Sequence, residues 1–190
     1  MKRYWRHNLK KIISALIFLV PALAFATIMV PLSMDDLAGN SDVIVQGIVT
    51  GRHVFAQGDR IFTEYTIRVS DVLKGAPGGE VKVVQPGGEL GRKGLYVAGV
   101  ARFAPAEEVI LFLGKDINGS RDVVGWAQGK FQVRYDEQTK TKFAAQQLQG
   151  LSFANQKTGT FSEPAASRIE VNALKAQIKT AVAGKKGAGK

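Results

Sequence analysis

The sequence predicts a mainly β protein, specifically a small OB-like antiparallel barrel, closed or partly open, with a short N-terminal helical turn and a C-terminal helix. Two long β-type segments, 42–55 and 60–73, are separated by the polar break 56–59. In the second segment every second residue falls on one face, and this period of two is typical of a half-buried strand. The residues of that face are Ile61, Thr63, Tyr65, Ile67 and Val69. Gly47 and Gly51 interrupt the first segment and predict a bulge, a device that lets long strands coil and close a barrel.

A helical turn is predicted before the first strand. Ser33 has a side chain suited to the N-cap, and Asp36 three residues later completes a capping box. Gly39 and Asn40 are predicted to end the turn.

The rest of the predicted barrel domain, 27–143, follows from shorter patterns. Residues 80–85 alternate as a third strand, and the glycine-rich stretch 86–102 is a long loop between strands. The dense apolar run in 107–113 indicates a central strand buried on both faces. Asn118-Gly119 is a hairpin signal, after which 123–126 returns. A last strand contains Phe131, Val133 and Tyr135, and a turn at 136–140 precedes a short return through Phe143.

The C-terminal part is predicted to pack a helix on the barrel. Residues 144–161 are rich in Gln, Gly and Asn and are interpreted as a loop or linker. Ser162 and Pro164 are typical of a helix start, so a helix is expected over 162–183. Its apolar stripe is Val171, Leu174, Ile178 and Val182. Gly184 is expected to end it, leaving 184–190 as a disordered basic tail.

Residues 1–26 have the pattern of an export signal. A basic head without acids precedes the apolar run 12–20, and Ala24-Phe25-Ala26 places small residues at both positions that a signal peptidase reads. Cleavage before Thr27 is therefore expected, giving a periplasmic or extracellular protein without a membrane span. Apolar character continues to Val30, so an uncleaved anchor is the alternative.

Charge is concentrated at the two ends of the chain. The net charge is +10, but residues 1–26 hold five of the 26 Lys and Arg and none of the 16 acids. Removing them leaves 21 basic against 16 acidic residues, a net charge of +5, and the last sixteen residues contribute five lysines and no acid. Residues 27–174 are therefore neutral, which argues against nucleic acid as a partner.

The sequence lacks the residues that several kinds of site and catalytic mechanism require. The chain has no cysteine, which excludes a disulfide framework, thiolate metal sites and a cysteine nucleophile. His53 is the one histidine after the leader, and it is interpreted as an exposed strand residue. Gly150–Ala154 lacks the last glycine of a nucleophile elbow, so a hydrolase ranks third among the functional hypotheses.

Metal and anion sites are weakly indicated. Asp35, Asp36 and Asp42 have oxygen ligands that suit calcium, but no Asp-x-Asp-x-Asp loop supports such a site. Glu107 and Glu108 are adjacent and point to opposite faces of a strand, so they do not form an acid–base pair. No cofactor and no metal site is predicted.

The glycine-rich loop is the candidate binding region. Loops of this kind often carry function in small barrels. Tyr96, two residues after Gly94, and Trp126, next to Gly125, are the two aromatic residues singled out for exposure. The candidate binding residues are Gly87, Gly88, Glu89, Arg92, Lys93, Tyr96 and Trp126.

A succession of motifs carries a resemblance: residues 41–47, 72–75, 86–89, 107–113 and 125–131. In this order they resemble a family of exported bacterial proteins without assigned activity, over most of the chain after the leader. The strand order is also distantly similar to the netrin-like domain, the OB-type barrel of metalloprotease inhibitors. Those inhibitors grip the catalytic zinc with an N-terminal cysteine, which this chain lacks. The resemblance therefore implies the barrel and a protein-binding habit only.

The leading hypothesis is an exported, non-enzymatic binding module whose partner is an exported protein, such as a protease, bound through loop 86–102. The alternative is a cell-envelope binder of polysaccharide or lipid that uses the basic tail. An exposed aromatic strip in a groove favours the saccharide, and a protruding apolar loop favours the protein.

Overall fold

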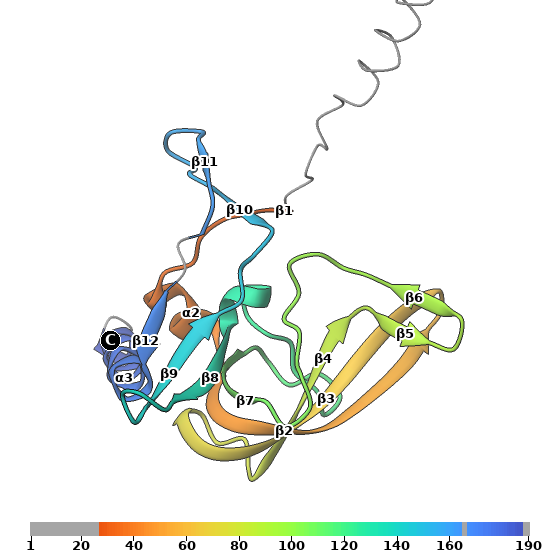
Figure 1. Cartoon of the computed structure of the whole chain (residues 1–190), viewed down its shortest axis with the longest axis horizontal. Helices are drawn as coiled ribbons and strands as arrows, with labels where there is room; N and C mark the ends of the chain where they lie inside the picture. Colours follow the sequence, from red (N-terminus) through yellow and green to blue (C-terminus); the bar gives the residue numbers. More distant parts are fainter. Residues whose placement is uncertain (1–26, 165–166, 188–190) are drawn as a thin grey trace, which may run out of the picture.

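A computed structural model describes residues 27–164 and 167–187. The expected leader, 1–26, and the last three residues of the expected tail lie outside the described residues. Antiparallel sheet dominates the fold, with a short helix near its start and a longer helix at its end (Figure 1). The prediction of a mainly β protein with these two helices is confirmed.

The elements up to the central strand are β1 (Thr27–Met29), α2 (Met34–Asn40), β2 (Val43–Gln57), β3 (Arg60–Lys74), β4 (Glu80–Pro86), β5 (Gly88–Leu90), β6 (Lys93–Leu95) and β7 (Glu108–Leu113). They are followed by the 3₁₀ helix η1 (Trp126–Gly129), β8 (Lys130–Asp136), β9 (Thr141–Gln146), β10 (Leu151–Ala154), β11 (Phe161–Ser162), β12 (Arg168–Glu170) and α3 (Val171–Gly187). A seven-stranded sheet has the order β12-β9-β8-β7-β2-β3-β4, while β1-β10-β11 and β5-β6 form two small sheets.

The hairpin of β2 and β3 follows the predicted pattern. Ile61, Thr63, Tyr65 and Ile67 are buried, and the alternate residues are less so. The pairing shifts register at Gln46/Gly47 and at Val49/Gly51, which are the bulges expected from the two glycines. A Cβ at Gly47 would lie 2.5 Å from the carbonyl oxygen of Arg68, so glycine lets the two backbones approach.

The closed barrel allowed by the sequence is not formed. β4 and β12 are the two edges of the large sheet, and in the described part of the chain no ladder joins them. Residues 120–124 run between β4 and β7 instead, with one bridge from Arg121 to Val83 and another from Val123 to Leu113. Turns at Asn118-Gly119 and at Gly125, all with positive φ, leave this segment too short for a ladder. The prediction that 123–126 returns is therefore confirmed only as a bridge.

Two apolar cores lie on opposite faces of the sheet. On one face α2 and α3 cover β2, β7, β8 and β9, with Leu37, Phe112, Leu174 and Ile178 at the centre. On the other face β2, β3, β4 and β7 curve around Val45, Ile67, Val83 and Leu111, closed by Ala101 and Phe103 of the long loop. Val109 to Leu113 have no exposed surface, so β7 is the central strand buried on both faces, as predicted.

The N-terminal helix and the short hairpins confirm their sequence signals. The Ser33 hydroxyl accepts from the Asp36 N–H while the Asp36 carboxylate accepts from the Ser33 N–H, so the capping box is complete. Ile117 and Ser120 pair across the Asn118-Gly119 turn. β8 and β9 form the predicted last hairpin, closed by the turn after Asp136.

The prediction for the C-terminal helix is wrong at both ends. Residues 161–162 and 168–170 form strands, and α3 begins at Val171, where the Glu170 carboxylate accepts from the N–H groups of Asn172 and Ala173. The helix also continues through the exposed Gly184 to Gly187, since one helical glycine costs only about 1 kcal/mol. The predicted stripe is confirmed, because Val171, Leu174 and Ile178 are buried.

The predicted linker 144–161 is also structured. β9 extends to Gln146, and β10 pairs in parallel with β1 and antiparallel with β11. Pairing with an N-terminal strand so distant in sequence is not encoded in the local composition. This small sheet lies along the upper side of Figure 1, above the large sheet.

Candidate functional site

The long loop after β4 carries a two-stranded hairpin, β5–β6, that lies beside the far ends of β2 and β3 (Figure 1). Gly87 and Gly88 have φ values of 103° and 138°, which disfavour any other residue. A Cβ at Gly88 would lie 2.5 Å from the Thr63 hydroxyl oxygen, and that hydroxyl donates to the Gly87 carbonyl over 2.7 Å. These two glycines therefore shape the base of the hairpin.

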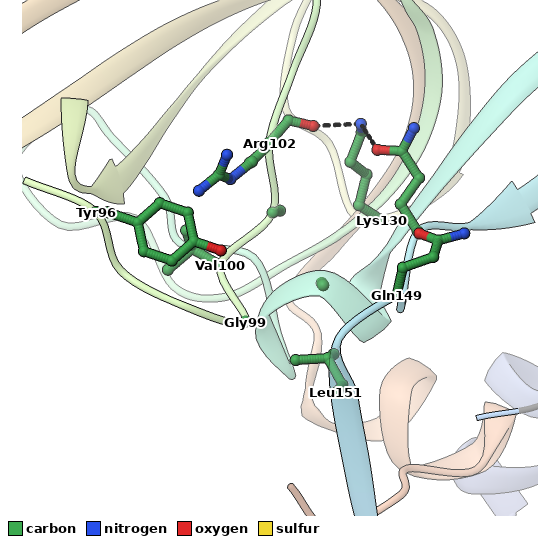
Figure 2. A pocket seen from close by; sticks show the side chains of 10 residues that line it. Tyr96, Gly99, Val100, Arg102, Lys130, Gln149 and Leu151 are labelled. Atoms are coloured by element: carbon green, nitrogen blue, oxygen red, sulfur yellow. Dashed lines mark hydrogen bonds between the residues drawn. The ribbon is translucent and has the colours of Figure 1, made fainter. Parts of the chain in front are cut away.

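Tyr96 follows the hairpin and is the most exposed large hydrophobic residue in the described chain, at 73%. The Arg102 guanidinium lies over its ring, with 4.2 Å between the guanidinium carbon and the ring centroid (Figure 2). A cation over an aromatic face adds about 0.5–1 kcal/mol at an exposed site. The stack therefore restrains two long side chains at the surface of the loop.

A buried ion pair anchors this loop to the sheet. Lys130 Nζ donates to Glu107 Oε1 over 2.7 Å, and the two side chains are only 3% and 4% exposed. The same ammonium donates to the Arg102 carbonyl, and Glu107 Oε2 accepts from the Ala104 N–H over 2.8 Å. Burial lowers the pKa of Lys130, and the hydrogen bond that Lys130 donates to Glu107 offsets part of that shift. Two charges thus fasten the backbone on both sides of Phe103.

Two adjoining hollows flank the Tyr96–Arg102 stack. The first, which we call the hairpin hollow, has a volume of about 540 Å³ and lies between β3, the β5–β6 hairpin and loop residues 96–105. The second, the lysine hollow, has about 250 Å³ and is lined by Lys130, Gln147, Gln149 and Leu151 beyond the stack (Figure 2). Tyr96 and Arg102 line both, so they stand at the boundary between them.

Exposed apolar side chains occur on several elements near these hollows and on the small β1-β10-β11 sheet. The described residues include ten large, exposed hydrophobic residues, and seven lie on the long loop and its hairpin, on η1 or on the chain of this small sheet: Ile28, Val30, Leu90, Leu95, Tyr96, Trp126 and Phe161. Three of these elements are linked, because Gly99 C=O of the loop accepts from Ala127 N–H of η1 over 2.9 Å and the Gln128 side chain bonds the backbone of Val30 and Leu32. We call these seven residues the apolar surface. Exposed apolar side chains beside a hollow are candidates for contact with a partner.

The structure brings together only part of the predicted site. Gly87, Gly88, Glu89 and Tyr96 line the hairpin hollow. Arg92 and Lys93 are exposed at the tip of the hairpin and line neither hollow. Trp126 is 45% exposed on η1, next to Ala127 of the lysine hollow. The expected exposure of Tyr96 and Trp126 is confirmed.

Sequence reasoning missed Lys130 and the role of Glu107. The opposite orientation of the two glutamates was predicted correctly, because Glu107 pairs with Lys130 while Glu108 pairs with Lys142 over 2.7 Å. The alternation of Phe131 and Val133 with Lys130 and Gln132 carried the signal that Lys130 faces away from the helices. It did not indicate that a lysine there is buried.

The structure places the histidine and serine of the hydrolase hypothesis in different sheets and gathers no group of metal ligands in the described chain. His53 is exposed on β2 and faces Glu64 in the large sheet, whereas Ser152 belongs to β10 in a small one. Across residues 27–164 and 167–187, no three His, Cys, Asp or Glu side chains come together as metal ligands. In the same residues no helix is long and apolar enough to cross a membrane.

Comparison with known proteins adds no functional assignment. No protein-family model matches the chain, and no curated protein is significantly similar to it in sequence.

Proposed function

We propose that this protein is an exported, non-enzymatic binding module whose partner is another exported protein, such as a protease. The observation that carries the proposal is the apolar surface, seven exposed hydrophobic residues on the long loop with its hairpin, η1 and the chain of the small β1-β10-β11 sheet. Aromatic residues are enriched at protein interfaces, and Tyr is among the most frequent hot-spot residues. Tyr96, exposed and already restrained by Arg102, has the properties of such an anchor.

The fold supports the same proposal at a coarser level. We interpret the large sheet as a partly open barrel of the OB type, in which the segment 120–124 stands where a closed barrel has a full ladder. On this interpretation, the distant likeness to the inhibitor barrel implies two things for this chain: a similar framework of strands, and loops at one end that contact a protein partner. Zinc chelation by cysteine is excluded, so contact with a protease would rest on packing and on the charged hairpin tip.

A capture experiment with paired variants tests the proposal. The full chain with an affinity tag is expressed in its source organism, and bound proteins are identified by mass spectrometry from the periplasm and the medium. Leu95→Asp and Tyr96→Asp place a charge in the apolar surface, whereas Ile117→Asp places one at an equally exposed apolar residue, 69%, on the turn between β7 and η1.

A specific exported partner should be retained by Ile117→Asp and lost from both loop variants. With purified partner, the loop variants should weaken binding about thirtyfold or more, corresponding to a hot spot of 2 kcal/mol or above. If the partner is a protease, its activity should fall as the protein is added. Equal capture by all three variants, or no capture by the parent, would show that this surface does not bind a protein.

A further inference from the structure

A third hollow lies on the face of β8 and β9 that α3 does not cover. It has a volume of about 680 Å³ and draws its lining from β8, β9, β12 and the chain after β9. We call it the glutamine hollow, because five glutamines line it: Gln132, Gln138, Gln146, Gln147 and Gln149. The seven residues of the apolar surface do not line this hollow. Its chemistry therefore differs from that of the apolar surface.

The amides of this hollow are only partly used by the protein itself. Gln147 donates through Nε2 to Gln132 Oε1 over 3.0 Å, which fixes one pair in position and leaves the Gln132 amide nitrogen as a donor. The side chains of Gln138 and Gln149 make no hydrogen bond to any described residue. Each amide offers a donor and an acceptor side by side, the combination that neighbouring hydroxyl groups of a sugar match.

One positive charge in the hollow is uncompensated. Arg168 is paired with Asp136 and lies over the Phe143 ring, 3.8 Å from its centroid. Arg134 is exposed, lines the same hollow and has no ion pair within the described residues. A guanidinium with free donors favours a planar carboxylate, which it can bind with two parallel hydrogen bonds.

We propose that the glutamine hollow binds an acidic oligosaccharide, with a uronic-acid carboxylate on Arg134 and hydroxyl groups on the glutamine amides. The glutamine hollow adjoins the lysine hollow, since Gln147 and Gln149 line both, but none of the seven residues of the apolar surface lines it. The protein would then carry two neighbouring binding sites of different chemistry. The proposal does not rest on protein binding at Tyr96.

Titration calorimetry with two hexasaccharides tests the ligand class. Hexagalacturonate, which carries a carboxylate on every sugar, should bind the full-chain protein with a dissociation constant of about 1 mM or tighter, while cellohexaose, which is neutral, should bind at least about tenfold more weakly. Equal affinity for both sugars, or no binding of hexagalacturonate at several millimolar, would overturn the proposal.

Three variants locate the site. Arg134→Gln should weaken hexagalacturonate binding about tenfold or more, because it removes a charge-assisted pair, and should leave cellohexaose unchanged. Gln132→Ala should weaken both sugars, because it removes an amide that contacts hydroxyl groups. Tyr96→Ala is the control, since it removes an exposed side chain that does not line the glutamine hollow, and it should leave both affinities unchanged. Full hexagalacturonate binding by folded Arg134→Gln would show that the sugar binds elsewhere.

Discussion

Replacing Lys130 by Met is expected to destabilise the protein strongly, because it leaves the Glu107 carboxylate buried without its counter-ion. The Glu107 side chain is 4% exposed and would keep only the Ala104 N–H as a partner. Removing one member of a buried ion pair costs about 3–5 kcal/mol. The loss of the charged donor to the Arg102 carbonyl is part of the same cost.

Lys142→Met is the matched control. Lys142 and Glu108 are also 2.7 Å apart, but their side chains are 48% and 22% exposed. An exposed pair of this kind contributes only about 0–1 kcal/mol, because water solvates both charges once the pair is broken. The two ion pairs therefore have the same N–O distance and differ in how far their side chains are buried.

Urea denaturation measures the difference. With a slope of about 2 kcal/mol per molar urea for a domain of this size, Lys130→Met should lower the midpoint by roughly 2 M and Lys142→Met by less than about 0.5 M. Equal midpoints for the two variants would refute the burial argument. The double variant Lys130→Met/Glu107→Leu removes both buried charges, and we expect it to recover part of the loss but not all, since the Arg102 carbonyl and Ala104 N–H each lose a partner worth about 1–3 kcal/mol.

Three further predictions concern the core, acid stability and export. Leu111→Ala should lower the free energy of unfolding by about 2–5 kcal/mol in chemical denaturation, because Leu111 has no exposed surface. His53→Ala, at an exposed residue of β2, should lower it by less than about 0.5 kcal/mol. Similar values for both variants would contradict the central position of β7. Hydrogen bonds from the Thr139 N–H and from Arg168 lower the pKa of Asp136 to about 2. The stabilisation linked to Asp136 is therefore present above pH 4 and lost as the pH falls towards 2. Asp136→Asn should flatten the pH dependence of the free energy of unfolding over this range. An Asp136 carboxyl that titrates near pH 4 by NMR would contradict the argument. N-terminal sequencing of the protein exported from a Gram-negative host should begin at Thr27, and an intact leader in the membrane fraction would show that cleavage does not occur.

Local patterns in the sequence were sufficient for the strands and turns whose determinants are neighbours in the chain. The alternation of β3, the apolar run of β7 and the capping box at Ser33 each depend on a few adjacent residues, and each is found where it was predicted. The glycine pair at the base of the hairpin was noticed for a binding role, but its positive φ angles give it a structural one. The two glycines were singled out correctly, and their contact with a ligand stays a prediction.

Features that depend on distant pairing were not predictable in this way. β10 forms because Leu151 to Phe153 pair with Thr27 to Met29, more than a hundred residues earlier, and β12 forms against β9 although Pro164 suggested a helix start. Lys130 follows the same rule, since its burial depends on Glu107 and on the carbonyl of Arg102. The apolar surface and the glutamine hollow are likewise assembled from segments that lie far apart in the sequence.

The buried ion pair is better explained by positioning than by stability. A buried pair exchanged for well-packed apolar residues often leaves a protein as stable or more so, which gives no reason to keep Lys130 and Glu107 for stability alone. Here the two charged groups bond the backbone of Arg102 and Ala104, and Arg102 in turn lies over Tyr96. A loop held in this way loses less conformational freedom when a partner binds, so more of the contact energy at Tyr96 appears as affinity. Lys130 is 3% exposed and is not expected to touch a partner, yet its loss should weaken binding at the apolar surface by releasing the loop that presents Tyr96.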